Sequence, residues 1–378
     1  MTTVAMSTVF FSGQAEYLAA RGFEIHAVSA PGETAFDKKR FEPVTTHTVP
    51  MSRSITPFSD VRALWHLYRL FRRLQPAIVH SHTPKAGLLG MLAGCLARVP
   101  LRIYHVHGLP LLTAPVAKRT LLRCTEMLAA QLSHQVLCVS ESVRQLMVQK
   151  GLCSANKVKV LLNGSINGID AATGFNPHRL GPKVRHQVRR AWGIPREALV
   201  IGFVGRLVKD KGIAELIEAW RIVAARFPNV HLLLVGPFES HDPLPAEQAD
   251  YLRSGPRVHL AGVQWNTPPF YRAMDVFCLP SHREGFGVVL LEAAAMELPS
   301  VAARIPGCVD SVDDGRTGTL VPARDAEALA TAIQRYLEDP DLRHQHGRTG
   351  RERVLRDFQR EAMWEATYQE YERLLHRQ

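Results

Sequence analysis

The sequence has few of the features that mark secreted, metal-stabilised or membrane-spanning proteins. Its six cysteines include no C-x-x-C pair, and several lie in apolar segments, where cysteine behaves as a small hydrophobic residue. This usage favours a reducing compartment and argues against a structural metal site. The longest apolar run, residues 86–97, has about 12 residues, whereas a helix that crosses a bilayer needs about 20. We therefore expect a cytoplasmic protein without a transmembrane segment.

Acidic residues are scarce in the first half of the chain. Residues 1–192 contain 24 lysines and arginines and only 9 aspartates and glutamates, a net charge of +15, whereas residues 193–378 contain 22 and 26, a net charge of −4. This distribution predicts an anionic surface or substrate for the first half. Zinc-finger spacing and aromatic-rich RNA-binding signatures are also missing, so we expect no nucleic acid partner. An anionic membrane fits the charge, since each basic residue near such a surface contributes about 1 kcal/mol.

The length and the alternation of apolar patterns predict a two-domain α/β protein. The chain has 378 residues, of which 46% are hydrophobic, so two packed domains are expected. Short β-rich segments alternate with amphipathic helical patterns, which is typical of doubly wound parallel sheets. Strands are predicted over residues 24–28, 77–80, 101–105, 135–139, 158–162, 199–204, 230–235, 257–261 and 275–279. Helices are predicted over residues 14–20, 60–74, 85–96, 116–132, 142–149, 213–226 and 288–296.

Three further segments complete this organisation. Residues 177–195 are basic and rich in proline and glycine and are interpreted as the junction between the domains, and the chain after Pro322 is expected to be helical.

A domain of this type should begin with a buried strand of about five or six apolar residues. Only Thr2–Ala5 precedes Met6–Gln14, which is interpreted as the first loop. We therefore expect the first strand to be truncated and the natural start to lie upstream.

The most informative segment is P-S-H-R-E-G-F-G, residues 280–287, followed by Glu292. A buried strand is predicted before it and a helix after it, an arrangement that holds phosphates because glycines let the backbone approach and free N–H groups face the anion. Glu284 and Glu292 could accept hydrogen bonds from hydroxyl groups on opposite sides of a bound diphosphate, as in a nucleotide-sugar. Glutamates are also common on loops and helix surfaces without a function, so their spacing alone is weak evidence. The glycine-rich loop around them favours a functional role.

A second basic loop, residues 205–213, follows the strand predicted over residues 199–204. Arg206 lies at the end of that strand and Lys211 at the start of the next helix. A guanidinium and an ammonium group converging from one loop suit the two phosphates of a nucleotide diphosphate, and they could neutralise the leaving group without a metal ion. Basic residues in such a loop can also be simply solvated, and Lys209 is the alternative to Lys211.

The two motifs together resemble those of the retaining glycosyltransferases of family 4, whose GT-B fold has two facing Rossmann-like domains. The resemblance covers essentially the whole chain and rests on these residues: Gly205-Arg206, Lys211-Gly212, Glu284–Gly287 with Glu292, and Asn163–Asp170. Residues 11–14, 80–85 and 105–108 resemble the branch that builds bacterial surface polysaccharides on a lipid carrier. Three parts are expected: an acceptor and membrane-side domain over residues 1–180, a nucleotide-sugar-binding domain over 181–357, and a C-terminal helix over 358–378 that packs back on the first domain.

The resemblance implies a role for each matching residue. Arg206 and Lys211 match a diphosphate clamp, Glu284 lies by the donor sugar, and Glu292 hydrogen-bonds the ribose. The backbone that meets the base, the sugar and the phosphates would come from Val263, Gly285, Phe286, Gly287 and Val288. His107 matches a first-domain histidine that faces the donor sugar across the cleft, although strand-end histidines satisfied by the backbone are commoner. The catalytic set is therefore expected to be Glu284, His107, Arg206 and Lys211, with no metal ion and no other cofactor.

The function predicted from the resemblance is a retaining transfer of a hexose or N-acetylhexosamine from a UDP-sugar to an undecaprenyl-diphosphate-linked saccharide. The enzyme would act at the inner face of the plasma membrane. Residues 60–76 form a basic amphipathic pattern with Trp65 and Tyr68, which could lie on an anionic membrane or cover the sheet of the first domain. Two alternatives share the fold: a nucleotide-sugar 2-epimerase and a non-catalytic nucleotide-sugar-binding partner of another transferase.

Overall fold

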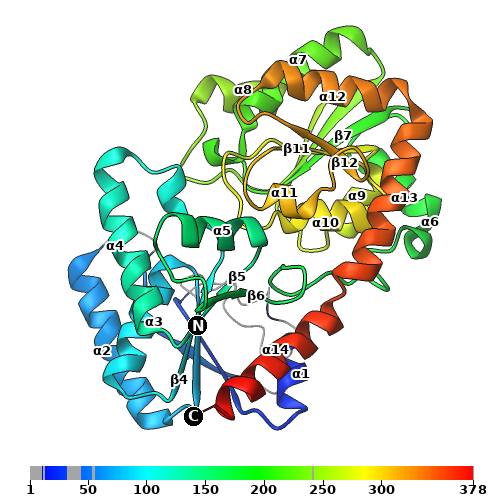
Figure 1. The fold of residues 1–378 in the computed structure, drawn as a ribbon. Coiled ribbons are helices and arrows are strands. Elements are labelled where there is room, and N and C mark those ends of the chain that lie inside the picture. Colours follow the sequence, from blue (N-terminus) through cyan, green and yellow to red (C-terminus); the bar gives the residue numbers. More distant parts are fainter. Residues whose placement is uncertain (1–10, 12, 32–43, 53–55, 241, 378) are drawn as a thin grey trace. The chain divides into compact units, whose positions relative to one another are not determined.

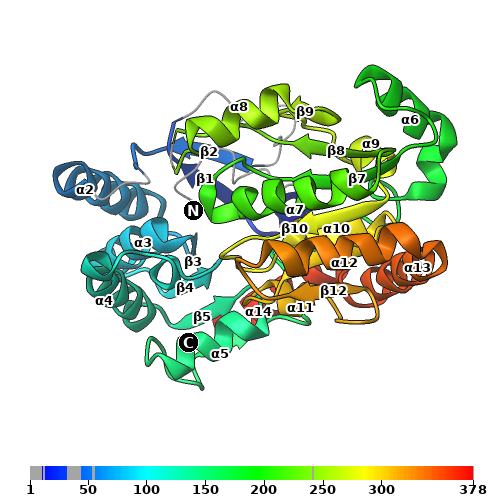
Figure 2. The same cartoon turned by 90° about the horizontal axis from the view of Figure 1, so that it is seen from above.

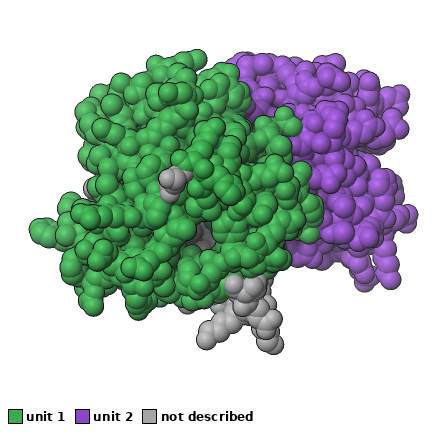
Figure 3. All heavy atoms as spheres, turned by 60° about the horizontal axis from the view of Figure 1, so that its bottom comes forward, with its two compact units in different colours: residues 1–168, 360–378 green, residues 169–359 purple. Residues whose placement is uncertain are grey.

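A computed structural model describes residues 11, 13–31, 44–52, 56–240 and 242–377. The chain forms two compact units, one of residues 1–168 with residues 360–378 and one of residues 169–359 (Figure 3). We call them the first and the second unit. The predicted loop over residues 6–14 and the predicted truncated strand fall mainly outside the described residues, so the expectation of an upstream start is not tested by them.

The second unit is built around a six-stranded sheet in the order β12-β11-β10-β7-β8-β9, in which all pairs are parallel. Its strands are β7 (Leu199–Val204), β8 (Val230–Val235), β9 (Val258–Gly262), β10 (Val276–Leu279), β11 (Ser300–Ala303) and β12 (Gly318–Val321). Residues of β8 and β10 are buried throughout, as expected for strands covered on both faces. The order reverses between β7 and β10, so their carboxyl ends adjoin at a topological switch point, where open α/β sheets bind ligands.

Helices flank this sheet, with α12 beside α7 and α13 beside α10 (Figure 1, Figure 2). The helices of the second unit are α6 (Pro177–Ala191), η3 (Lys209–Lys211), α7 (Ile213–Arg226), α8 (Ala246–Ser254), α9 (Pro268–Ala273), α10 (Val288–Ala295), α11 (Cys308–Ser311), α12 (Ala326–Glu338) and α13 (Pro340–Asp357). The chain after Pro322 is helical as expected, apart from short connections between the helices and its last described residues. The predicted helices over residues 213–226 and 288–296 correspond to α7 and α10.

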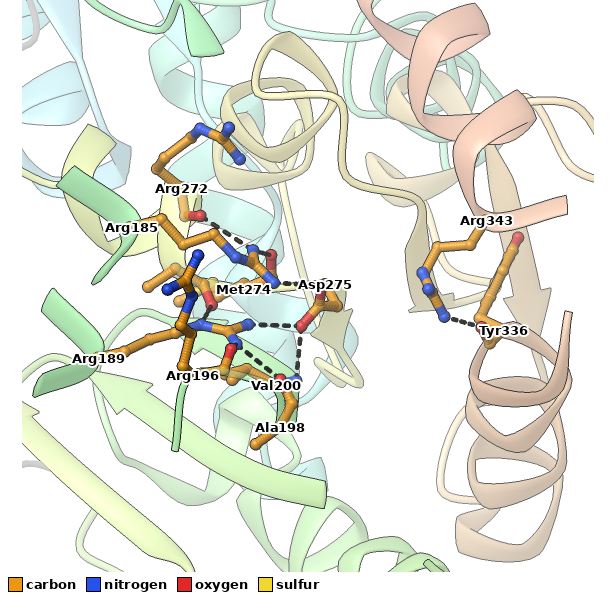
Figure 4. A network of polar contacts seen from close by, with 11 residues as sticks. Arg185, Arg189, Arg196, Ala198, Val200, Arg272, Met274, Asp275, Tyr336 and Arg343 are labelled. Atoms are coloured by element: carbon orange, nitrogen blue, oxygen red, sulfur yellow. Dashed lines mark hydrogen bonds and ion pairs between the residues drawn. The ribbon is translucent and has the colours of Figure 1, made fainter. Parts of the chain in front are cut away.

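Residues 177–191 form helix α6 within the second unit, so the interpretation of residues 177–195 as the junction between the domains was wrong. Asn176 accepts a hydrogen bond from the backbone N–H of His178, and the helix kinks at Gly181. Arg185 and Arg189 form ion pairs of 2.7 and 2.8 Å with Asp275, which precedes β10 (Figure 4). These contacts make α6 part of the second unit, so the division lies at Gly168 and Ile169 and not near residue 180.

In the part of the first unit that the structure describes, the strands form two parallel sheets, β1-β2 and β3-β4-β5-β6. Its strands are β1 (Ile25–Ser29), β2 (Val44–Thr48), β3 (Ile78–His82), β4 (Leu101–Val106), β5 (Gln135–Cys138) and β6 (Val158–Val160). Its helices are α1 (Gln14–Ala19), α2 (Pro57–Leu74), α3 (Pro84–Leu96), η2 (Pro110–Leu112), α4 (Val116–Leu132), α5 (Glu141–Gln149) and α14 (Arg360–Leu375). In the described residues, no helix combines the length and the apolar character that crossing a membrane requires.

The C-terminal helix α14 packs on the first unit. Its Met363, Tyr371 and Leu374 share an apolar cluster with residues of β4, β5 and α1. Polar contacts add to this packing: Trp364 donates a hydrogen bond of 2.5 Å to Asn167, and the Tyr371 hydroxyl lies 2.6 Å from Nδ1 of His80. Helix α14 therefore belongs to the first unit and packs on it through its apolar residues.

Candidate functional site

The loop between β10 and α10 holds the first predicted motif in a fixed conformation. Phe286 is buried, and its carbonyl oxygen accepts a hydrogen bond from the Ser311 hydroxyl. Gly307 approaches the loop so closely that a Cβ there would lie 2.7 Å from the carbonyl carbon of Gly285. Gly287 precedes α10 and has no side chain to cap it, so the first N–H groups of the helix can face an anion.

The loop between β7 and α7 touches the first motif directly. Gly212 has a φ of +68°, and a Cβ at this position would lie 2.0 Å from the carbonyl oxygen of Pro280. The backbone N–H of His282 donates to the carbonyl oxygen of Asp210 over 2.9 Å, and Arg283 pairs with the Asp210 carboxylate at 2.6 Å. The two motifs found separately in the sequence therefore form one surface at the switch point.

Lys211 and Glu284 lie side by side in this surface. The Lys211 ammonium nitrogen is 2.5 Å from Oε1 of Glu284, and both side chains are largely shielded from solvent. Two predicted binding residues from loops more than 70 positions apart are thus in contact, since the hydrogen bond joins positions separated by 73 residues. The lysine carries the charge suited to a phosphate and the glutamate can accept hydrogen bonds from sugar hydroxyls.

Arg206 has a different partner. Its guanidinium forms an ion pair of 2.9 Å with Glu239, in the loop after β8. That loop packs tightly on the end of β7, because a Cβ at Gly236 would lie 1.9 Å from the carbonyl oxygen of Gly205. The loops after β7, β8 and β10 therefore contact one another, and the Arg206 side chain is partly exposed among them.

Glu292 lies on α10 and is bound by a residue that the sequence did not single out. The Tyr271 hydroxyl of α9 donates a hydrogen bond of 2.7 Å to Oε2 of Glu292. Burial raises the pKa of Glu292 to about 7, although the Tyr271 hydrogen bond lowers it. Its carboxyl group is thus poised to change protonation near neutral pH.

Val263 lies just after β9 and is 51% exposed. This exposure is compatible with the predicted contact between its backbone and a ligand.

The predicted histidine, His107, lies in the first unit within a cluster of four. Nε2 of His107 is 2.9 Å from Nδ1 of His82, and burial lowers the pKa of His107 to about 3, so the ring is neutral. Ring nitrogens of His80, His82 and His105 lie within 4.8 Å of one another and are geometrically able to hold a metal ion. Burial also holds the pKa of each of these three well below its ordinary value. A catalytic role for His107 stays a prediction.

Two residues of the second unit, Glu239 and Tyr271, were not identified from the sequence as partners of Arg206 and Glu292. Glu239 follows a strand and a glycine, as Arg206 does, so the repetition of a strand–glycine pattern was an available signal. Tyr271 lies on a short helix among apolar residues, and only the folded structure brings it to Glu292. No local pattern identifies such a contact.

Two adjoining loops and helix α10 thus bring together, at the switch point, Lys211, Arg206, Glu284 and Glu292 beside a helix start that has no side-chain cap. The chain matches the family "Glycosyl transferases group 1" over residues 184–353 and "Glycosyl transferase 4-like domain" over residues 7–164. Its fold resembles that of sucrose-phosphate synthase from Thermosynechococcus elongatus, with a TM-score of 0.82, 23% identity and coverage of 98% of this chain and 94% of that chain. It also resembles HepE of Anabaena in complex with UDP-glucose, with a TM-score of 0.77, 21% identity and 95% coverage of each chain.

Two curated relatives extend these matches. The chain is 36% identical, over 97% of its length and 94% of the relative, to the capsular polysaccharide biosynthesis glycosyltransferase CapM of Staphylococcus aureus. It is 27% identical, over 77% of its length and 74% of the relative, to an Escherichia coli UDP-Gal:alpha-D-GlcNAc-diphosphoundecaprenol alpha-1,3-galactosyltransferase. The fold and these matches together define a glycosyltransferase of the GT-B class. The chain belongs to the group 1 glycosyltransferases with a family 4-like N-terminal domain, which confirms the predicted family and fold class.

Proposed function

We propose that this glycosyltransferase moves a hexose or N-acetylhexosamine from a UDP-sugar to a lipid-diphosphate-linked saccharide in cell-surface polysaccharide synthesis. The observation that carries the donor side is the contact of Lys211 with Glu284 beside the start of α10. A diphosphate bound there would be neutralised by Lys211 and Arg206, and its sugar would lie by Glu284. The same cations would stabilise the departing diphosphate, so the proposed reaction needs no metal ion.

The proposed transfer retains the configuration of the sugar at its anomeric carbon. The bond from this carbon to the β-phosphate oxygen breaks, and a bond to an acceptor hydroxyl oxygen forms on the same face. UDP leaves with the electron pair of the broken bond, and the proton of the acceptor hydroxyl passes to the departing β-phosphate oxygen. Glu284, hydrogen-bonded to sugar hydroxyl groups, would hold the ring in place during this step. His107 of the first unit is proposed as a further catalytic residue.

The acceptor class is proposed from the names of the relatives. The Escherichia coli relative acts on a GlcNAc-diphosphoundecaprenol, and a Campylobacter jejuni relative, 26% identical, is named for a diphospho-undecaprenol acceptor. CapM is named for capsular polysaccharide biosynthesis. A saccharide on an undecaprenyl diphosphate carrier is therefore the acceptor that we propose for this chain.

A lipid-linked acceptor requires access to a membrane, and the first unit has a surface suited to it. Helices α2, α3 and α4 lie side by side (Figure 1). Helix α2 buries Leu67, Leu70 and Phe71, yet it exposes Phe58 to 94% and Trp65 to 56%. Helix α4 also exposes apolar residues, and both helices expose basic residues: Val116, Leu121, Leu128, Arg62, Arg69, Lys118 and Arg123. We propose that this surface, the α2–α4 face, binds the anionic inner face of the plasma membrane.

The proposal is tested by measuring UDP release from a panel of UDP-sugars in EDTA, with and without a bacterial lipid extract. We expect release from one donor, dependent on the lipid, and loss of release in Glu284→Ala. The anomeric configuration of the product, read by NMR, should equal that of the donor. Interconversion of UDP-sugars without release would indicate an epimerase. UDP binding without turnover of any donor would indicate a non-catalytic partner, and either result would overturn the proposal.

A further inference from the structure

Ion pairs at adjacent positions join the loops that follow β7 and β10. One is the Lys211–Glu284 pair of the candidate site, which we call the site pair. The other, which we call the outer pair, links Asp210 and Arg283, the residues that directly precede Lys211 and Glu284. In the outer pair, Nη2 and Nε of the guanidinium lie 2.6 and 3.1 Å from the same carboxylate oxygen. Neighbouring residues of one loop thus pair with neighbouring residues of the other.

Asp210 is held by backbone contacts as well as by Arg283. Its carbonyl oxygen accepts a hydrogen bond of 2.9 Å from the backbone N–H of His282. Its own N–H donates a hydrogen bond of 2.7 Å to the carboxylate of Asp242, in the loop after β8. Asp210 therefore contacts two neighbouring loops through atoms that do not involve the side chain of Lys211.

The site pair is not compatible with the proposed roles of its two residues in a donor complex. Lys211 would turn to the phosphates and Glu284 to the sugar hydroxyls, so the contact of 2.5 Å between the loops would be lost. Loss of one charged hydrogen bond favours separation of the loops by about 10- to 100-fold. The outer pair contains none of the residues predicted to bind the donor, so it can stay closed while the site pair opens.

We propose that Asp210 and Arg283 are positioning residues, whose ion pair keeps the two loops together while a donor separates Lys211 from Glu284. The inference rests on the proposed donor site and adds two residues to it. Without the outer pair, the donor itself would have to order the loops, and this cost would offset part of its binding free energy. An ion pair that serves only the fold would act equally whether the site pair is closed or open.

The first experiment needs no donor. Glu284→Gln removes the site pair, Arg283→Gln removes the outer pair, and hydrogen exchange of the backbone amides over residues 280–287 measures local opening of the loop. We expect each single variant to exchange within about twofold of wild type, because one remaining pair holds the loops, and the double variant to exchange at least about tenfold faster. Peptides from α12 serve as the reference for global unfolding. Fast exchange in Glu284→Gln alone, or a double variant no faster than the product of the single effects, would overturn the proposal.

The second experiment measures UDP affinity, sugar transfer and melting temperature in Arg283→Gln, in Asp210→Asn, and in the exchanged chain Asp210→Arg with Arg283→Asp. We expect UDP affinity to fall by about tenfold in the two single variants and to recover to within about threefold of wild type in the exchanged chain. Arg226→Gln, which removes a more exposed ion pair with Glu338, should bind UDP as wild type does.

The outcomes separate positioning from a purely structural role. Lowered melting temperatures with unchanged UDP affinity, or no recovery of affinity in the exchanged chain, would show that the outer pair serves the fold alone and would overturn the proposal. A wild type that binds UDP but transfers no sugar would refute the proposed function, whereas affinity and hydrogen exchange would still decide whether Asp210 and Arg283 position the loops.

Discussion

The Lys211–Glu284 contact places a positive and a negative group 2.5 Å apart at the proposed donor site, where we propose that the diphosphate and the sugar meet. The two groups form an ion pair with each other. When a donor binds, we expect this pair to be replaced by separate contacts of each group with the donor. Lysine would then face the phosphates and glutamate the sugar hydroxyls. This division of roles can be tested because UDP carries the diphosphate without the sugar.

We predict that Glu284→Gln separates UDP binding from sugar transfer. UDP affinity should change by less than about tenfold, which is about 1.4 kcal/mol. Transfer should fall by about 10²–10³, because the charged group nearest the reacting sugar is lost. Titration calorimetry gives the affinity, and UDP release gives the rate. Equal losses of affinity and rate would show that Glu284 serves the diphosphate and not the sugar.

Glu292 should make stability depend on pH. Its pKa is raised from 4.5 to about 7 by burial, so the folded state keeps a proton that the unfolded state has lost between these values. The free energy of unfolding should therefore fall as the pH rises from about 4.5 to 7, by up to about 3 kcal/mol, and level off above that. Urea unfolding at pH 5 and pH 8 measures the difference, and Glu292→Gln should reduce it.

A matched control exists in the first unit. Burial also raises the pKa of Glu126 to about 7, and Tyr104 donates a hydrogen bond of 2.7 Å to it. Glu126→Gln should reduce the same pH dependence through the first unit, whereas UDP binding in the second unit should stay unchanged. A Glu292→Gln protein with the full pH dependence of the wild type would contradict the account of this carboxyl group.

At the scale of single residues, the sequence was sufficient for groups whose chemistry is local. The positions of Glu284 and Lys211 could be predicted because each lies in a glycine-containing loop between a strand and a helix, and the structure brings the two side chains into contact, but their roles stay predictions. Glu239 and Tyr271 could not, because their importance arises from contacts with Arg206 and Glu292 that only the folded chain creates. The positions of His107 and Val263 agree with strand ends, but their roles stay predictions.

The elements of the second unit meet through close backbone contacts, and Gly212 makes the clearest of them. Its φ of +68° is unfavourable for other residues, and a Cβ would collide with Pro280. We predict that Gly212→Ala destabilises the protein by more than the about 1–2 kcal/mol expected for the backbone conformation alone. It should also weaken UDP binding, since the collision would separate the two loops.

Gly193 provides the control for this prediction. Its φ is +65°, but nothing lies within 4 Å of a Cβ placed there. Gly193→Ala should therefore show the conformational cost alone and leave UDP binding unchanged. Thermal unfolding and calorimetry compare the two variants. Similar losses of stability in both, with UDP binding intact, would show that the contact with Pro280 does not hold the loops together.

Prediction of the elements from sequence was limited by strand length and by charge. Long apolar strands such as β7 and β8 were found because each has six residues, nearly all apolar. Strands β11 and β12 have four residues each, with serine, alanine, glycine or threonine among them, and such short segments resemble loops. Helix α6 was mistaken for a junction because its proline, glycine and arginines look solvated, whereas Arg185 and Arg189 in fact pair with Asp275.

For the whole molecule, the uneven charge and the α2–α4 face predict selective binding to anionic membranes. The triple variant Phe58→Ser, Val61→Ser and Trp65→Ser should reduce co-sedimentation with anionic vesicles, because these three residues are exposed and would enter the membrane interface. Ile222→Ser, which removes an exposed apolar residue of the second unit, should have no effect. Equal weak binding of wild type to anionic and neutral vesicles would contradict the prediction.

The central claim is that the loops after β7 and β10 form a metal-independent diphosphate site. The most direct measurement is calorimetric titration of UDP in EDTA into wild type, Lys211→Ala and Lys209→Ala. We predict that wild type binds one UDP, and that Lys211→Ala weakens binding by about 10- to 100-fold, since a charged hydrogen bond contributes about 1.5–3 kcal/mol. Lys209→Ala should bind as wild type does. Loss of binding in Lys209→Ala with Lys211→Ala unaffected, or binding only after a divalent metal is added, would contradict the account.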